Sequence, residues 1–247
     1  MTQSQYAVDI QGLSKQFSKA DPVVLDGLSL RVEKGEFICL LGASGCGKST
    51  LLNILAGLDT ATSGTVSVSE KPTLMFQDAS LMPWLTAGQN IELALRIRGL
   101  AKAERRARAE ELLELVHLPS AFDKRPHELS GGMRQRVSIA RAIAQERSIL
   151  LMDEPFAALD AITRDFLHDE LTSIWQRTGL TVIFVTHNVR EAVRLGQRVL
   201  LMSSKPGRFL REWQVELPES RKIDSPEVAK MASEITNHLR DEIKRHG

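Results

Sequence analysis

Residues 42–50 decide the fold, and they read Gly42-Ala43-Ser44-Gly45-Cys46-Gly47-Lys48-Ser49-Thr50. This stretch fits the pattern G-x-x-x-x-G-K-[ST] at every specified position. Glycines let the backbone curl so that successive N–H groups point at one anion. The lysine adds a full charge for the β- and γ-phosphates of a nucleotide, and the hydroxyl after it can bind Mg²⁺. We therefore predict a phosphate site formed by Gly42, Ser44, Gly45, Cys46, Gly47, Lys48, Ser49 and Thr50.

The surroundings of this loop predict an α/β fold. A continuous apolar run, residues 37–41, precedes it, and a helical pattern over 51–58 follows it. Apolar runs of this length are typical of strands buried on both faces of a parallel sheet. Three more runs lie downstream and are separated by helical patterns, at 149–152, 181–185 and 199–202. This alternation indicates a mostly parallel sheet covered by helices.

Two regions depart from that pattern. Residues 6–10 and 23–32 alternate apolar and polar positions, which predicts antiparallel strands. Residues 86–145 are rich in Ala, Leu, Glu and Arg, and 101–117 has the pattern of an amphipathic helix. We thus expect a P-loop NTPase core with an N-terminal antiparallel β subdomain and an inserted helical subdomain.

A pair of carboxylates follows the apolar run 149–152. Asp153 and Glu154 are expected at the tip of a buried strand beside the strand of the phosphate loop. Asp153 is then placed to hold Mg²⁺. Glu154 is placed to polarise an attacking water as a general base. The two carboxylates should face different partners.

A second helix start carries the features of an anion site. In Leu129-Ser130-Gly131-Gly132-Met133-Arg134-Gln135, Ser130 can cap a helix whose first residues are glycine. Such a terminus lets a phosphate approach the backbone amides. One nucleotide does not need both helix N-termini, the one after the phosphate loop and the one at Ser130, to come from the same chain. A head-to-tail dimer, in which Ser130, Gly131 and Gly132 cover the γ-phosphate held by the other copy, uses both.

Taken together, these motifs resemble those of the nucleotide-binding subunits of ABC transporters, over nearly all of residues 6–217. Residues 129–133 are similar to the family signature LSGGQ, with Met133 in place of Gln. The resemblance implies an ATP- and Mg²⁺-dependent ATPase domain at 1–217, with a helical subdomain at about 86–145 inserted in it. We further expect a C-terminal amphipathic helical tail at 218–247.

The same resemblance assigns further site residues. Phe17 resembles the aromatic that stacks on adenine, and Gln77 resembles the glutamine that touches the metal or water. Ala158-Leu159-Asp160 resembles the D-loop, through which Asp160 acts across the dimer. His187 resembles the switch histidine that contacts the γ-phosphate. The family usually has Asp after this histidine, whereas Asn188 stands here, which leaves its local hydrogen bonding open.

The stretch 76–85, followed by Gln89-Asn90-Ile91, and the stretch 156–164 resemble importers of the nitrate/sulfonate/taurine/bicarbonate group, most closely the aliphatic sulfonate ATPases. This implies a homodimer, two permease subunits and an extracytoplasmic solute-binding protein. It also implies a peripheral position on the cytoplasmic face of a bacterial inner membrane. Leu81, Met82 and Trp84 either line a groove for a permease helix or pack internally.

For the tail, Ser225 is the expected cap and Pro226 the first residue of a helix. Its apolar positions recur at three- and four-residue steps: Val228, Met231, Ile235, Leu239 and Ile243. Packing on the core is favoured over binding a partner. Separately, Cys46 lies near a helix start that is expected to lower its thiol pKa. Alkylation there would then inactivate the enzyme, and ATP would protect it.

Composition excludes other classes. With 32 basic and 31 acidic side chains, the net charge is +1, which argues against nucleic acid as a partner. The two cysteines suit a reducing compartment. Residues 1–20 show no signal peptide, and no stretch approaches the roughly 18 apolar residues of a spanning helix. A soluble ABC ATPase and a P-loop kinase remain the rivals, and a purely regulatory role ranks last.

Overall fold

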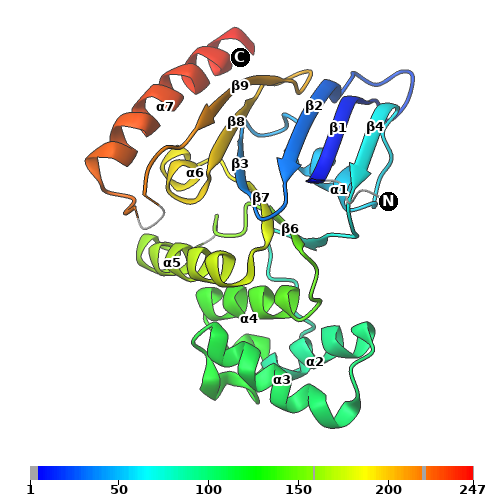
Figure 1. Cartoon of the computed structure of the whole chain (residues 1–247), viewed down its shortest axis with the longest axis vertical. Helices are drawn as coiled ribbons and strands as arrows, with labels where there is room; N and C mark the ends of the chain where they lie inside the picture. Colours follow the sequence, from blue (N-terminus) through cyan, green and yellow to red (C-terminus); the bar gives the residue numbers. More distant parts are fainter. Residues whose placement is uncertain (1–4, 158, 219–220, 247) are drawn as a thin grey trace.

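The computed structural model describes residues 5–157, 159–218 and 221–246. A six-stranded sheet forms its centre, in the order β5-β6-β7-β3-β8-β9 (Figure 1). The strands are β3 (Phe37–Leu41), β5 (Thr73–Met75), β6 (Ile149–Asp153), β7 (Thr181–Val185), β8 (Arg198–Met202) and β9 (Phe209–Gln214). All neighbours are parallel except β8 and β9. The expectation of an α/β fold with a mostly parallel sheet is confirmed.

One expectation about this sheet is wrong. The strand that ends in Asp153 does not lie beside the strand of the phosphate loop, because β7 pairs with both β6 and β3 and separates them. Every residue of β3 and β7 is buried, and β6 is buried up to its last residue. Apolar runs this similar carry no information about which of them become neighbours.

A second, smaller sheet is antiparallel. It has the order β2-β1-β4, formed by β1 (Tyr6–Lys15), β2 (Leu25–Glu33) and β4 (Ser63–Val68). The alternating burial along β2 shows that one face of this sheet packs inward. The N-terminal antiparallel unit predicted from the sequence is confirmed, and Figure 1 shows it on one side of the large sheet.

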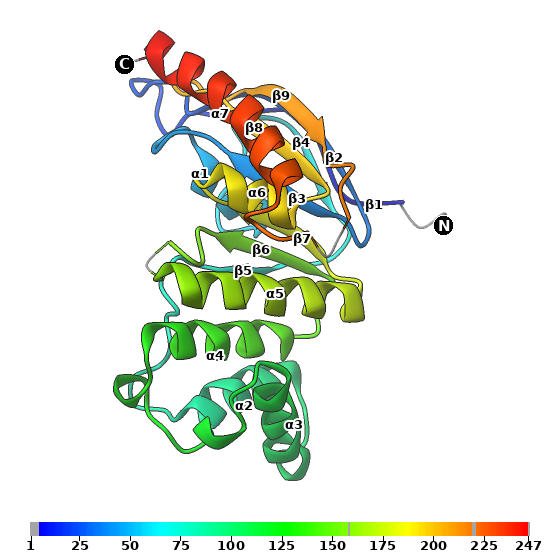
Figure 2. The same ribbon diagram turned by 90° about the vertical axis from the view of Figure 1, so that its left-hand side faces the viewer.

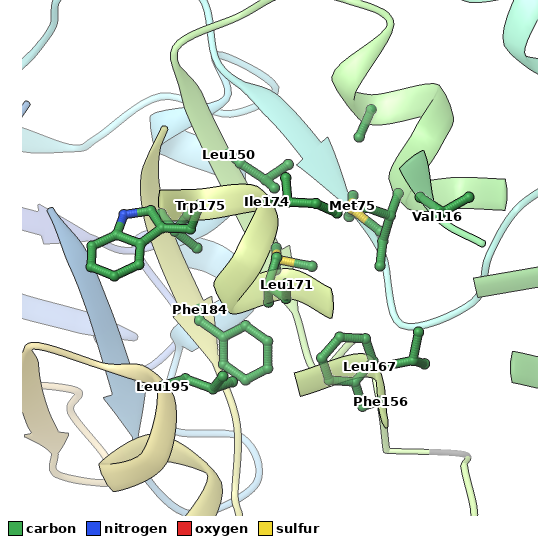
Figure 3. Packing of buried hydrophobic residues seen from close by; sticks show 14 of the residues in the cluster. Met75, Val116, Leu150, Phe156, Leu167, Leu171, Ile174, Trp175, Phe184 and Leu195 are labelled. Carbon is green, nitrogen blue, oxygen red and sulfur yellow. The ribbon is translucent and has the colours of Figure 1, made fainter. Parts of the chain in front are cut away.

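Helices complete two layers around the large sheet. Along β3, Phe37, Cys39 and Leu41 belong to one apolar cluster, and the residues between them belong to a second. The second cluster includes α1 (Lys48–Leu55) and the small sheet. The first includes α5 (Ala161–Thr178), α6 (Val189–Leu195) and α7 (Pro226–His246). In this first layer the ring of Trp175 meets Phe37 edge-on at 5.7 Å, and Figure 3 shows α5 residues packed over Phe184 and Phe156.

A helical region lies between β5 and β6 in the chain. It contains α2 (Ala87–Arg98), α3 (Lys102–Leu115), two short 3₁₀ helices (Pro119–Ala121 and Pro126–Glu128) and α4 (Gly131–Ile143). The helix predicted over 101–117 is thus observed at Lys102–Leu115. Figure 2 shows this region at one end of the molecule, with α4 alongside α5.

The tail helix α7 packs on the core, as favoured from its pattern. The Ser225 hydroxyl accepts a hydrogen bond from the Val228 amide at 3.3 Å, which confirms the predicted cap. Val228 and Ile235 are buried, and two further apolar residues, Met231 and Leu239, pack against the same cluster. The side chain of Ile243 lies outside those the structure describes. No helix within the described ranges combines the length and apolar character needed to span a membrane.

Candidate nucleotide site

The phosphate loop joins β3 to α1 as a strand–loop–helix unit. Gly47 precedes the first residue of α1 and has a φ of 99°, a left-handed conformation that side chains disfavour. A Cβ placed on Gly47 would come within 2.5 Å of the Leu25 side chain. Only glycine therefore fits this position, and the backbone amides after it are left free to face an anion.

Lys48 supplies the charge of this loop. Its side chain is mostly buried, and its Nζ donates to the carbonyl oxygens of Gly42 at 2.9 Å and Ala43 at 3.1 Å. The ammonium group is thereby held inside the loop rather than in solvent. By contrast, Ser44 and Ser49 are exposed, so their hydroxyls are open to a ligand.

Cys46 does not have the reactive environment expected for it. Its side chain is buried beneath the loop, and a Cβ on Gly42 would lie 2.6 Å from its Sγ. Burial raises the pKa of the Cys46 thiol, and the opposing effect of the Lys48 ammonium, 3.6 Å away, is smaller. The expectation of a lowered thiol pKa is wrong, because desolvation of the buried sulfur outweighs the Lys48 charge and the hydrogen bonds that oppose it.

The topology gathers four predicted motifs at one edge of the sheet. Gln77 follows β5, Glu154 follows β6, His187 follows β7, and the phosphate loop follows β3. These four strands are consecutive and parallel, so their carboxyl ends lie together. Ligands of open α/β sheets bind outside such ends. Between these motifs, the His187 Nδ1 lies 3.1 Å from the Glu154 Oε2, within hydrogen-bonding distance.

Glu154 has an unusual backbone conformation. Its φ is 46°, left-handed for a residue with a side chain, which costs about 1 kcal/mol or more. Two hydrogen bonds maintain it: the Glu154 amide donates to the Val185 oxygen at 3.0 Å, and its own carbonyl accepts from the Ala157 amide at 3.2 Å. Asp153, by contrast, is the last residue of β6 in regular register with Val185. Asp153 therefore continues the regular strand, whereas Glu154 departs from strand geometry.

The residues predicted for Mg²⁺ fit that ion chemically. Ser49, Gln77 and Asp153 offer a hydroxyl, an amide and a carboxylate, all oxygen donors of the kind that Mg²⁺ prefers. Gln77 follows β5 and Asp153 ends β6, and these two strands are paired, since Met75 lies opposite Met152. Among the described residues, neither the Gln77 amide nor the Asp153 carboxylate has a partner in the protein, so both oxygens are available.

The second helix terminus has the predicted cap. The Ser130 Oγ accepts a hydrogen bond from the Met133 amide at 3.2 Å. Met133 itself packs against the core, so its departure from the signature leaves the serine and glycine positions unaffected. Gly132 sits against α5, because a Cβ there would come within 2.3 Å of the Thr163 Cγ2. The terminus of α4 is therefore locked against the start of α5.

Asp160 occupies the start of α5. Its Oδ1 accepts from the Thr163 amide at 2.9 Å and its Oδ2 from the Thr163 hydroxyl at 2.7 Å. These hydrogen bonds lower the pKa of Asp160, the amide contributing most. Asp160 thus caps α5 and adjoins Gly132 through Thr163. Ala158, the first residue of the predicted D-loop, lies outside the described residues.

Phe17 is an exposed aromatic, with 60% of its surface accessible. It lies in the loop after β1, where the Lys15 ammonium is 4.8 Å from its ring centroid. The Lys15 oxygen accepts from the Val24 amide at 2.8 Å, and Val24 borders Gly47 of the phosphate loop. The far end of the loop that carries Phe17 thereby touches the phosphate loop.

Within the stretch 76–85, one apolar side chain packs internally and another lines a groove, which are the two possibilities that the sequence left open. Leu81 packs against the core, whereas Trp84 is 67% exposed. Trp84 lines a groove of about 620 Å³ whose other lining residues are Met82, Leu85, Gln89, Glu92, Leu93, Arg96, Lys102, Arg105 and Arg106. Internal packing therefore explains Leu81 but not Trp84.

Three polar residues that hold the site were not found from the sequence; Asn90 and Glu191 are buried, and Arg141 is partly buried. The Asn90 Oδ1 accepts from the Met82 amide, and the Asn90 Nδ2 donates to the Met82 oxygen. Together these hydrogen bonds fix the turn that presents Trp84. Arg141 of α4 donates to backbone oxygens of the Gln77 loop at 2.7 and 2.8 Å. Glu191 accepts a hydrogen bond from the hydroxyl of Thr186, the residue before His187. Asn90 and Arg141 lie in the stretches examined, but a polar residue in a helical pattern does not reveal its partner.

Fold and site together define a P-loop nucleotide hydrolase. The family model described as "ABC transporter" matches residues 25–157. The chain is 41% identical to the nitrate import ATP-binding protein NrtD of Synechocystis sp., over 94% of this chain and 95% of that protein. It is 44% identical to the bicarbonate transport ATP-binding protein CmpC of Synechocystis sp., over 94% of this chain and 38% of CmpC.

A solved structure agrees. The dimeric post-hydrolysis ATP-binding cassette MJ0796, bound to ADP and Pi, superposes with a TM-score of 0.74 at 33% identity, covering 85% of this chain and all of that one. The chain therefore belongs to the ABC transporter family, and its domain binds and hydrolyses ATP.

Proposed function

We propose that this chain is the ATP-hydrolysing subunit of a bacterial importer for a small oxyanion or sulfonate. Two copies work with two permease subunits at the cytoplasmic face of the inner membrane, and a solute-binding protein delivers the solute. The similarity to a nitrate import protein along almost the full length of both chains supports this assignment. The bicarbonate relative supports the same class of solute.

We propose the following roles within the site. Phe17 stacks on adenine, and the loop 42–50 with Lys48 holds the phosphates. Ser130, Gly131, Gly132 and Asp160 come from the partner copy and close over the γ-phosphate. Ser49, Gln77 and Asp153 are the residues that would hold Mg²⁺, which neutralises phosphate charge when bound.

The observation that carries the hydrolytic role is the 3.1 Å contact between Glu154 and His187 at the carboxyl edge of the sheet. Glu154 accepts a proton from the attacking water as general base. His187 orients the Glu154 carboxylate and, once ATP is bound, donates to the γ-phosphate. Its ring is exposed, so it can turn toward a ligand without leaving its strand end.

Glu154→Gln tests this role. Loss of a general base lowers turnover by about 10²–10⁴-fold. We expect the variant to keep its ATP affinity and to form a stable ATP-loaded dimer, measured by nucleotide titration and by light scattering after size exclusion. Glu110→Gln, an exposed carboxylate on α3, is the matched control. Parental turnover in Glu154→Gln would refute the assignment.

The groove beside Trp84 is the proposed contact with the permease. Its lining combines apolar side chains with four basic residues, Arg96, Lys102, Arg105 and Arg106, and one acidic residue, Glu92. A short helix with apolar and acidic side chains complements this surface. Trp84→Ala should abolish uptake by the assembled importer while the isolated chain keeps its ATPase turnover. Ile97→Ala removes an apolar side chain of α2 that is more exposed than Trp84 and lies outside the groove, and it should leave uptake intact.

Uptake of labelled nitrate, bicarbonate and taurine by cells with and without this chain identifies the solute. A Lys48→Ala chain is the control for dependence on ATP. ATP-dependent uptake of none of the three would contradict the proposed solute class. Transfer of the γ-phosphate to an acceptor other than water would favour the kinase alternative.

A further inference from the structure

A chain of buried hydrogen bonds lies directly behind the switch histidine. Thr186, between the end of β7 and His187, is almost fully buried. Its hydroxyl donates to the Glu191 Oε2 and accepts from the Asn188 amide at 3.0 Å. The Asn188 side chain in turn accepts from the Glu191 amide at 3.3 Å and caps α6. The hydrogen bonding of Asn188, open from the sequence, is thus part of this network.

Glu191 connects this loop to α5. It is 4% exposed, and its Oε1 lies 2.6 Å from the Nε2 of His168, which is completely buried. Arg194 approaches the other ring nitrogen, Nδ1, at 3.4 Å. Because a guanidinium has no acceptor, Nδ1 accepts and Nε2–H donates to Glu191. Both carboxylate oxygens therefore receive a hydrogen bond, one from Thr186 and one from His168.

The network also reaches the loop of the proposed base. The ring of His168 meets Phe156 edge-on at 5.5 Å, and Phe156 stands two residues after Glu154. Phe156 further packs on Phe184 of β7 at 5.7 Å, as Figure 3 shows. The buried pair of Glu191 and His168 therefore supports the backbone on both sides of the contact between Glu154 and His187.

We propose that Glu191 is a positioning residue for His187, acting with His168 and Thr186. By anchoring the loop after β7, it holds the imidazole within reach of Glu154 and of an incoming γ-phosphate. The inference depends on the role of His187 given under Proposed function. A carboxylate suits the task because two donors converge on it, and an unpaired buried donor is costly.

Glu191→Gln separates positioning from simple packing. The substitution preserves shape but replaces one acceptor oxygen with an NH₂ group that cannot accept, so either the Thr186 hydroxyl or the His168 Nε2–H loses its acceptor. We expect ATP turnover to fall about tenfold or more, as loss of a buried hydrogen bond to a charged group implies. ATP affinity should change less than twofold, because the phosphate loop is untouched. Arg190→Gln, an exposed neighbour on α6, is the matched control and should retain parental turnover.

A second variant and a second readout guard against misfolding. Thr186→Val removes the hydroxyl with little change in volume and should lower turnover as Glu191→Gln does, whereas Thr186→Ser should retain more. The ring NMR signals of His187, assigned by their absence in His187→Ala, should shift in Glu191→Gln and Thr186→Val but not in Arg190→Gln. Such a shift reports on the position of the imidazole independently of turnover.

A double-variant cycle decides the proposal. If Glu191 acts through His187, adding Glu191→Gln to His187→Ala lowers turnover no further than His187→Ala alone. If the losses of turnover caused by the two substitutions multiply in the double variant, the positioning role of Glu191 is overturned. Unshifted His187 ring signals in Glu191→Gln would overturn it too. Either result leaves the ATPase assignment intact. Parental turnover in His187→Ala would instead overturn the role of His187, and this inference with it.

Discussion

Gly132→Ala is predicted to destabilise the protein through a single contact between the helical region and α5. A Cβ at this position would lie 2.3 Å from the Thr163 Cγ2. The Thr163 methyl group cannot turn aside, because Asp160 fixes that residue. The Thr163 hydroxyl donates to the Asp160 Oδ2 at 2.7 Å, and the Thr163 amide donates to the Asp160 Oδ1 at 2.9 Å. Overpacking of this kind costs about 1–3 kcal/mol.

For a chain of this size, each kcal/mol lowers the unfolding temperature by about 2–4 °C. Gly132→Ala should therefore unfold about 2–12 °C below the parent in a thermal scan without nucleotide. Gly131→Ala is the matched control, since its Cβ would meet only Leu159 at 3.6 Å and Arg134 at 3.9 Å. Its stability should stay within about 1 kcal/mol of the parent.

A second substitution, at Thr163, tests whether the clash between residue 132 and Thr163 causes the loss of stability. Thr163→Ser removes the Cγ2 but keeps the hydroxyl bonded to Asp160. The pair Gly132→Ala with Thr163→Ser should recover most of the loss, a coupling that separate sites do not show. A parental unfolding temperature for Gly132→Ala, or no recovery in the pair, would refute this account of the junction.

Three further predictions concern the site. Lys48→Ala should weaken ATP binding about tenfold or more in calorimetric titration, because a charge-assisted contact to phosphate is lost; an unchanged dissociation constant would count against the phosphate role. Cys46 should react with iodoacetamide only as the protein unfolds, since burial raises its thiol pKa and covers the sulfur; rapid modification of the native chain would show otherwise. The pKa of Asp160 is lowered from its ordinary value of 3.8, so its stabilising effect is complete above that pH and is lost as the pH falls through the lowered value. Asp160→Asn keeps a helix cap and should weaken the acid sensitivity of unfolding below pH 3.8; identical acid profiles would contradict this.

The parts of the site that could be predicted are local in sequence. The loop 42–50 combines its chemistry with a strand before it and a helix after it, so residue types and their order sufficed. The cap at Ser130 was predictable for the same reason, because a cap bonds an amide three residues away. The two carboxylates at the end of β6, Asp153 and Glu154, were found because a buried strand ends there.

The parts that could not be predicted depend on distant residues. The apolar pattern of a single strand does not reveal its neighbours in the sheet, so the position of β7 between β6 and β3 could not be predicted. The strands β4 and β9 lie at sheet edges with mostly accessible side chains, so they lack an apolar signature. His168 and Glu191 are 23 residues apart, and only the packing of α5 on α6 brings them together. Burial of Cys46 by the fold likewise reversed the pKa shift expected from its helix alone.

The central claim is that two helix ends, from different copies of the chain, enclose one triphosphate. Cross-linking of mixed chains tests it most directly. One chain carries Ser44→Cys and the other Ser130→Cys, both exposed positions, in a Glu154→Gln background with ATP and Mg²⁺. With a short bifunctional thiol reagent, we predict a cross-linked dimer in the mixture that requires ATP and is absent from either chain alone. Linkage of these two positions only within a single chain that carries both cysteines, with none between chains, would contradict the claim.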